Sequence, residues 1–161
     1  MRRVIVNSTP LIVLCNVGKL DILRKLYTEI HIPQAVFYEV TEKSDTACQV
    51  LKESLDWIYV EKIHSETDKK MYKAKLHDGE VEVMILAQED KRADLVIIDD
   101  NAAKKTAKYL GLSVTGTMGV LLRAKREGYL TEIAPIVEEL RGNGFYISDN
   151  LAEMILEQAG E

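Results

Sequence analysis

Apolar and polar residues follow one another in blocks that predict strands and helices in turn. Short apolar runs predict buried strands at residues 3–7, 29–32 and 94–98, and a last short strand at 112–114. Residues 57–63 alternate apolar and polar positions, which predicts a strand at an exposed edge. Helical spacing predicts the remaining elements. They cover residues 11–17, 20–27, a stretch that starts at 33, and residues 47–55, 71–75, 80–89, 102–110, 120–127, 131–140 and 148–158.

Turn and capping residues predict where several of these elements begin and end. Ser8 and Thr9 supply an N-cap hydroxyl, and Pro10 suits the first helical position. Gly18 can end that helix in the left-handed conformation. Residues 77–79 interrupt the helical pattern before the helix at 80–89, and the polar residues 64–70 predict a loop.

The alternation of strands and helices predicts the fold class. Near-continuous apolar strands separated by helices are typical of an α/β protein whose parallel sheet is covered on both faces. A length of 161 residues suits one domain, and no repeat or linker divides it. We therefore expect residues 1–161 to form a single domain, with the helices after about residue 131 packing on it or on a partner.

Composition and charge exclude several classes of protein. Cys15, Cys48 and three scattered histidines do not form a zinc-binding pattern, and isolated cysteines suit a reducing, cytoplasmic compartment. A net charge of −5 argues against a general nucleic-acid coat protein. The apolar stretches are shorter than the ~20 residues of a membrane span. Residues 4–14 begin like a signal peptide, but polar residues and Pro10 interrupt them, which favours a strand entering a helix.

Polar side chains follow the predicted strands, where parallel sheets bind ligands. Two glutamates also stand in otherwise apolar helical surroundings. The residues concerned are Asn7 after the first strand, Asp99 and Asp100 after the fourth, Thr115 and Thr117 after the fifth, and the helical Glu39 and Glu80. Gathered carboxylates repel one another unless a cation lies among them. Hard oxygen ligands suit Mg²⁺ or Mn²⁺, ions that can promote phosphodiester cleavage.

Each of these residues also has a purely structural interpretation. Asp99 and Asp100 can cap the helix at 102–110, and Glu80 suits the positive end of its helix dipole. Glu39 can be a solvated helix residue, and the two threonines can be helix caps. Their joint placement, rather than any one of them, favours a functional site.

Five stretches carry a recognisable pattern. They are VNSTPLI (6–12), IPQAVFYEV (32–40), GEVEVMILA (79–87), LVIIDD (95–100) and GLSVTGTMGVLLRAKREG (111–128). Together they resemble the PIN-domain nucleases, and in particular the DUF3368 family, over the chain from Val4 to about Ile155. The last two stretches in succession are the most specific.

This resemblance implies a three-layer α/β/α fold with a central parallel sheet of about five strands. It also implies an Mg²⁺- or Mn²⁺-dependent ribonuclease site similar to that of the VapC toxins of toxin–antitoxin pairs. The metal-binding and catalytic positions correspond to Asn7, Glu39, Glu80 and Asp99, with Glu82 as an alternative to Glu80. Auxiliary positions correspond to Thr9, Asp100, Thr115 and Thr117.

Asn7 departs from the pattern of the resemblance, because PIN nucleases usually have aspartate at this position. Asparagine offers a neutral carbonyl oxygen and therefore one negative charge fewer. The alternative function is accordingly a catalytically weakened PIN-like module that binds RNA or a protein. A receiver-like phospho-acceptor domain fits less well, because its acidic pair follows the first strand and Asp99-Asp100 follows the fourth.

Basic residues on two predicted helices are candidates for contacts with an RNA backbone. Lys104 and Lys105 follow Asp99, and Arg123 and Arg126 follow Thr117. Solvated helix surface is the competing interpretation. The seven tyrosines are too dispersed to define a base-stacking platform. The resemblance further implies a homodimer and a small antitoxin as partners.

Overall fold

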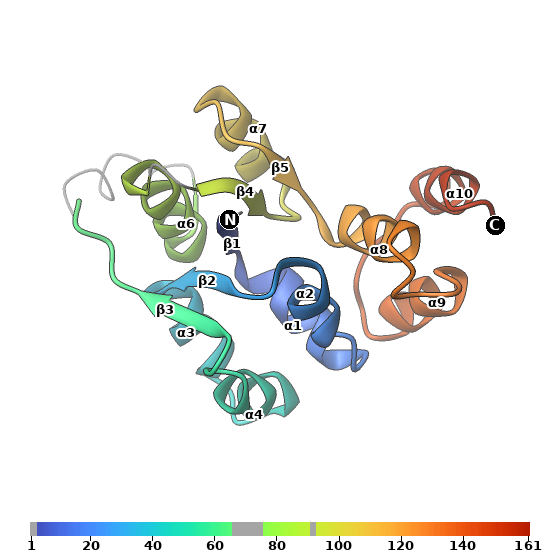
Figure 1. Cartoon of the computed structure of the whole chain (residues 1–161), viewed down its shortest axis with the longest axis horizontal. Helices are drawn as coiled ribbons and strands as arrows, with labels where there is room; N and C mark the ends of the chain where they lie inside the picture. Colours follow the sequence, from blue (N-terminus) through green and yellow to red (C-terminus); the bar gives the residue numbers. More distant parts are fainter. Residues whose placement is uncertain (1–2, 66–75, 91–92) are drawn as a thin grey trace.

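Five short strands form one sheet in which neighbouring strands run parallel, in the order β3-β2-β1-β4-β5 (Figure 1). The structure is a computed structural model that describes residues 3–65, 76–90 and 93–161. The strands are β1 (Arg3–Val6), β2 (Ile30–Pro33), β3 (Ile58–Glu61), β4 (Ala93–Ile97) and β5 (Val114–Thr115). The predicted parallel sheet of about five strands is thus confirmed.

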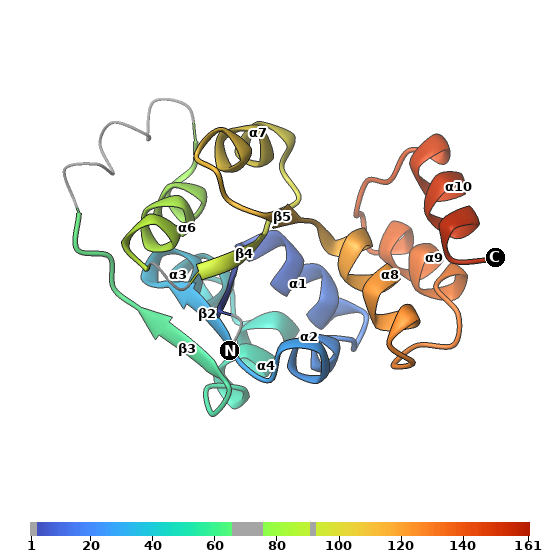
Figure 2. The same ribbon diagram turned by 45° about the horizontal axis from the view of Figure 1, so that its top comes forward.

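Helices connect the strands and cover the sheet (Figures 1 and 2). They are α1 (Ser8–Asn16), α2 (Asp21–Tyr27), α3 (Gln34–Thr41), α4 (Thr46–Glu53), α6 (Asp78–Glu89), α7 (Asn101–Tyr109), α8 (Thr117–Arg126), α9 (Ala134–Gly142) and α10 (Asp149–Gln158). Helix α6 contacts β1, β2 and β4, and α3 packs against α6. The three-layer α/β/α fold is confirmed.

The central strand forms the middle of the hydrophobic core. Val4, Ile5 and Val6 of β1 have no exposed surface, because β1 lies between β2 and β4 and is covered by helices. β3 lies at the edge of the sheet, as predicted, but its exposure does not alternate, because the successive residues Tyr59 and Val60 are both exposed. The continuous apolar run therefore indicated a central strand correctly, and the mixed run at 57–63 indicated an edge strand.

Some element boundaries differ from the sequence-based predictions. Helix α1 begins at Ser8 with Asn7 as its N-cap, so Pro10 is the third helical residue. Proline is tolerated there because N–H groups of the first turn have no helical acceptor. Residues 78 and 79 begin α6 instead of interrupting it, and β5 lies at Val114–Thr115 rather than at 112–114. The predicted helix at 71–75 and most of the loop at 64–70 lie outside the described residues.

Helices α8, α9 and α10 group together beyond β5, at the end of the molecule that carries the C-terminus (Figures 1 and 2). Ile136, Leu140 and Ile155 are buried and join the same core as the sheet, whereas Leu151 and Met154 are exposed. No helix in the described part of the chain is long and apolar enough to span a membrane.

Glu161 holds the start of α9. Its carboxylate accepts hydrogen bonds from Lys125 Nζ at 2.8 Å and from the backbone N–H groups of Ile133 and Ala134 at 2.8 and 3.0 Å. The hydrogen bond from Lys125, followed by those from the two N–H groups, lowers the pKa of Glu161 to about 2. Ionised Glu161 therefore stabilises the folded state.

We expect Glu161→Gln to lower the melting temperature at pH 7. Because the pKa is depressed on folding, this stabilisation is present above the ordinary glutamate value of 4.5 and is lost as pH falls toward 2. Circular dichroism melting curves between pH 2.5 and 7 measure the difference. The control is Glu157→Gln, an exposed change on α10. Parallel pH curves for Glu161→Gln and the wild type would contradict this assignment.

Candidate functional site

The sheet topology directs polar residues to one edge. In the order β3-β2-β1-β4-β5, the chain reverses its progression between β1 and β4, and open parallel sheets bind ligands at the carboxyl ends of strands beside such a point. Asn7 follows β1 and Asp99 lies two residues after β4. The N–H of Asn7 donates to the carbonyl oxygen of Ile97 at 2.9 Å, which joins these two strand ends.

Glu39 of α3 bridges the first turns of two other helices. Its Oε2 accepts a hydrogen bond from Ser8 Oγ of α1 at 2.5 Å, and its Oε1 accepts one from the backbone N–H of Gly79 of α6 at 2.8 Å. Helix N-termini offer unpaired N–H groups and the positive end of the helix dipole, so a carboxylate is stabilised there. Glu39 thereby connects three segments that are far apart in sequence.

Gly79 leaves the space that the carboxylate of Glu39 occupies. A β-carbon at position 79 would stand 2.4 Å from Oε1 and 2.8 Å from Oε2 of Glu39. Any other residue at this position therefore requires the carboxylate to move. This contact therefore depends on the lack of a side chain at Gly79 as well as on its N–H group.

Asp99 makes the corresponding contact with the first turn of α8. Its Oδ1 accepts from the N–H of Thr117 at 2.8 Å, and its Oδ2 accepts from Thr117 Oγ1 at 2.6 Å. A β-carbon on Gly116 would stand 2.7 Å from Asp99 Oδ1 and 2.9 Å from Lys104 Nζ. The ammonium of Lys104 and the carboxylate of Asp99 therefore both approach the space beside Gly116, which the glycine leaves free for them.

Glu80 is a buried carboxyl group among like charges. It is 7% exposed, and burial, followed by the negative charge of Asp100, raises its pKa. Glu39 adds to this rise, while the charge and the backbone N–H of His77 oppose it. Asp100 and Glu39 are therefore each within electrostatic reach of Glu80. Asp100 also caps α7, accepting from the N–H of Ala103 at 2.9 Å.

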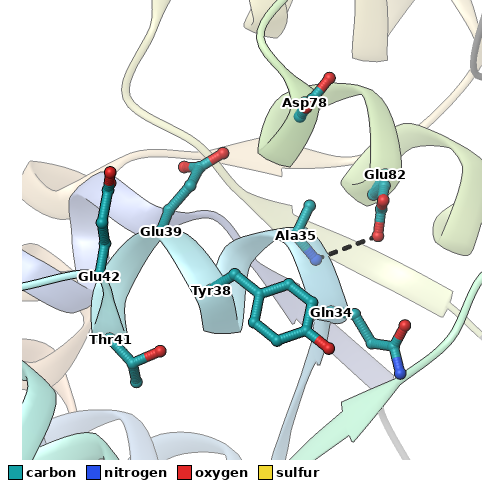
Figure 3. Close-up of a pocket in the computed structure, with 8 residues that line it drawn as sticks. All are labelled: Gln34, Ala35, Tyr38, Glu39, Thr41, Glu42, Asp78 and Glu82. Carbon is teal, nitrogen blue, oxygen red and sulfur yellow. Dashed lines mark hydrogen bonds between the residues drawn. The ribbon is translucent and has the colours of Figure 1, made fainter.

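Glu82, the alternative to Glu80, contacts a different helix. Its Oε1 accepts from the N–H of Ala35 in the first turn of α3 at 3.1 Å, and Figure 3 shows the side chain directed at this group. Asn7 is 6% exposed, and its side chain does not cap α1. The side-chain amide of Asn7 therefore makes no capping hydrogen bond to α1.

The hydroxyl groups take different roles. Thr117 is buried and binds Asp99, whereas Thr9 is exposed and Ser8, its neighbour, contacts Glu39 instead. Thr115 Oγ1 lies 2.1 Å from where a β-carbon of Gly119 would stand, so it is packed against the start of α8. The sequence indicated Ser8 as a helix cap and residue 79 as part of an interruption, but it did not indicate their contacts with Glu39. Their adjacency to Asn7 and Glu80 was the only available signal.

The basic residues also differ in their surroundings. Arg123 forms an ion pair with Glu127 at 3.5 Å, and its guanidinium lies 5.3 Å from the centre of the Tyr27 ring. Lys105 and Arg126 are exposed. Arg123 is thus engaged in packing between α8 and α2, and Lys104 is the cation beside an acidic group of the site.

The side chains fit a hard divalent cation by chemistry, but they do not form a ready-made cage. Asn7, Glu39, Glu80 and Asp99 present only oxygen ligands of the kind that Mg²⁺ and Mn²⁺ prefer. Among residues 3–65, 76–90 and 93–161, no three Asp, Glu, His or Cys side chains group closely enough to hold a metal ion. The N–H and hydroxyl groups that hold Glu39 and Asp99 would have to share these carboxylates with an ion.

We expect Glu80→Gln to raise the melting temperature at pH 7 to 8. Because folding raises the pKa of Glu80, its ionisation destabilises the native state, and this cost disappears as pH falls below the folded-state value. Melting curves from pH 4 to 8 check this, with the exposed change Glu153→Gln as the control. A gain that persists undiminished at pH 4 would show that side-chain packing, not charge, is responsible.

Comparison with known proteins gives one result that agrees with this fold. Residues 3–161 match the model of the family DUF3368, described as a PIN domain, and no curated protein matches the sequence. PIN domains are generally nucleases, so the fold is of a nuclease type. The match covers nearly the whole sequence. The chain therefore belongs to the DUF3368 family of PIN domains.

Proposed function

We propose that this protein is a divalent-metal-dependent endoribonuclease that hydrolyses RNA phosphodiester bonds at the edge of the sheet described above. The observation that carries the proposal is the arrangement of Glu39, Glu80 and Asp99. Glu39 and Asp99 accept hydrogen bonds from the first turns of α6 and α8, and Glu80, in the first turn of α6, lies within electrostatic reach of Glu39. Membership of a family of generally nucleolytic domains supports the same chemistry.

Glu39, Glu80, Asp99 and the amide oxygen of Asn7 would hold the Mg²⁺ or Mn²⁺ ion. When bound, such an ion supplies an activated water and neutralises charge on the phosphate. The residues around these ligands orient them. Ser8 and the N–H of Gly79 direct Glu39, and Thr117 directs Asp99.

Lysines beside the site would bind the RNA backbone. Lys104 lies next to Asp99, at the start of α7, where a cation is disfavoured by the helix dipole. The negative charge of the site compensates for this placement and leaves an ammonium available to a phosphate oxygen. Lys105 and Arg126 are exposed and can extend this contact, whereas Arg123 is held by Glu127 and Tyr27.

The proposed biological setting is that of a cytoplasmic toxin-type nuclease, paired with a small antitoxin and acting as a homodimer. A second candidate function is a PIN-like module that binds RNA or a protein without cutting it. The neutral side chain of Asn7 favours this second function, because it reduces the charge that attracts a cation. The second function is also favoured because Glu39 and Asp99 already accept hydrogen bonds from N–H groups, which compete with a metal ion for their oxygens.

Asn7→Asp is the decisive test between the two functions. A further anionic oxygen should tighten Mn²⁺ binding roughly tenfold, equivalent to about 1.4 kcal/mol. It should also lower the metal-free melting temperature, because another carboxylate joins the cluster. Calorimetric Mn²⁺ titration and cleavage of labelled single-stranded RNA are measured for both proteins and for Glu39→Gln. Cleavage that is absent from the wild type and from Asn7→Asp would leave the binding module as the function.

Gly79→Ala tests the contact between Glu39 and α6. Alanine suits a helix better than glycine by up to about 1 kcal/mol, which offsets stability lost with this contact, so the melting temperature should change little. The new β-carbon should nevertheless displace the flexible end of Glu39 and weaken Mn²⁺ binding and RNA cleavage. Gly142→Ala, in open space at the end of α9, is the matched control and should leave both unchanged. Normal Mn²⁺ binding by Gly79→Ala would remove Glu39 from the site.

A further inference from the structure

Helix α7 carries positive charge in a chain that is acidic overall. Its sequence, NAAKKTAKY, contains three lysines and no acidic residue, whereas the whole chain has a net charge of −5. The helix packs on β5, and it lies at the periphery of the molecule in both ribbon views (Figures 1 and 2). A local group of cations on an acidic protein favours a polyanionic partner.

One side of α7 is buried and the other side is open. Ala103 and Ala107 have no exposed surface and attach the helix to the hydrophobic core. Lys105 and Lys108 are exposed, and Tyr109 is 91% exposed. The buried alanines are one turn apart, and the exposed residues follow each of them by one or two positions, which places them on the outer face. This outer face of α7 is therefore accessible to a ligand.

Two rows of side chains lead along the outer face of α7 away from the proposed catalytic site. The first row begins with Lys104, whose Nζ approaches the space beside Gly116, and continues one turn later with Lys108. The second row consists of Lys105 and, one turn later, Tyr109. Because a helix rises about 1.5 Å per residue, Tyr109 lies about 7.5 Å along the axis beyond Lys104, a length similar to that of one or two nucleotides.

The outer lysines of α7 are not engaged in ion pairs. Among the residues that the structure describes, none forms an ion pair with Lys105 or Lys108. On α8, by contrast, Arg123 and Lys125 both pair with glutamates. The helix dipole favours Lys108 in the last turn, but it does not favour Lys105 in the first half of α7. Helix stability therefore does not account for the charge at Lys105.

The exposed ring of Tyr109 adds a stacking surface to these cations. An aromatic face can stack on any base, so such a contact tolerates different sequences. Cations beside the ring bind the backbone of the same strand. The seven tyrosines of the chain form no platform, but one exposed ring is sufficient for one base. A duplex, whose bases already stack on one another, presents no free base to this ring.

We propose that the outer face of α7 binds a single-stranded segment of RNA next to the phosphate that is cleaved, an inference that rests on the proposed nuclease function. Lys105 and Lys108 bind phosphates of this segment, and Tyr109 stacks on one unpaired base. The charge of α7 matches the RNA backbone, and its first turn is continuous with the site at Asp99. The face therefore selects unpaired RNA without selecting a sequence.

The test is binding of a fluorescent twelve-nucleotide oligouridylate to the metal-free full chain, measured by anisotropy at several salt concentrations. Each phosphate contact with a single strand contributes about 0.7 to the slope of log K against log salt concentration. The double change Lys105→Gln and Lys108→Gln should therefore reduce the steepness of this slope by about 1.4. Tyr109→Ala should weaken binding about fivefold and leave the slope unchanged, whereas Tyr109→Trp should retain the affinity.

Matched controls separate local contacts from general effects. The double change Lys43→Gln and Lys52→Gln removes the same charge at two exposed positions. Lys52 belongs to α4, which lies at the opposite end from α7 in both ribbon views (Figures 1 and 2). Tyr146→Ala removes another ring, 86% exposed, between α9 and α10. We expect the slope to stay nearly unchanged in the lysine control and the affinity to stay unchanged in Tyr146→Ala.

Several results would overturn the proposal. They are RNA affinity that is unchanged in both α7 variants, an equal change of slope in the two double lysine variants, and equally tight binding of a duplex of the same length. Tighter α7-dependent binding of a hexaglutamate peptide than of the RNA would assign the face to an acidic protein partner instead. Because the titration needs no metal, α7-dependent RNA binding without cleavage would contradict only the nuclease function.

Discussion

The candidate site depends on one interaction, the hydrogen bond from a helix N-terminus to a carboxylate. In a parallel sheet every strand ends at the same edge, and the helix that follows it begins there with unpaired N–H groups. Four carboxylates accept such a hydrogen bond here. Glu39 accepts it from Gly79, and Asp99 accepts it from Thr117. Asp100 accepts it from Ala103, and Glu82 accepts it from Ala35. The same contacts neutralise part of the acidic charge and join α3 to α6 and β4 to α8, so fold and site share them.

This interaction explains how several acids can be concentrated without unfolding the protein. Burial and the charge of Asp100 raise the pKa of Glu80 and outweigh the opposing effect of His77. Glycine provides the room that the other carboxylates need. Positions 79 and 116 place backbone against Glu39 and Asp99 at distances that a β-carbon would not allow. The arrangement of the carboxylates therefore requires glycine at positions 79 and 116 as well as the charged residues themselves.

Asn7, unlike these carboxylates, does not bind the N-terminus of the helix that follows it. It is buried at the end of the central strand, and its amide does not cap α1, the helix that follows it. A carboxylate there would add charge where the neighbouring acids are already close enough to affect one another. A neutral asparagine avoids this repulsion between carboxylates, but it also attracts a cation less strongly. The balance between stability and metal binding at this edge therefore depends on a single neutral residue.

The sequence by itself determined the strands and the side chains at their ends. The apolar run before Asn7 and the run before Asp99 identified buried strands, and the alternation around Tyr59 identified an edge. Tertiary structure decided which polar atoms meet. Whether Ser8 or Thr9 reaches Glu39, and whether Glu82 faces the site or Ala35, depends on how α3 crosses α1 and α6, and these helices are 31 to 47 residues apart at the contacts. Local periodicity places a residue on its own helix, but the partner across the contact is set by packing alone.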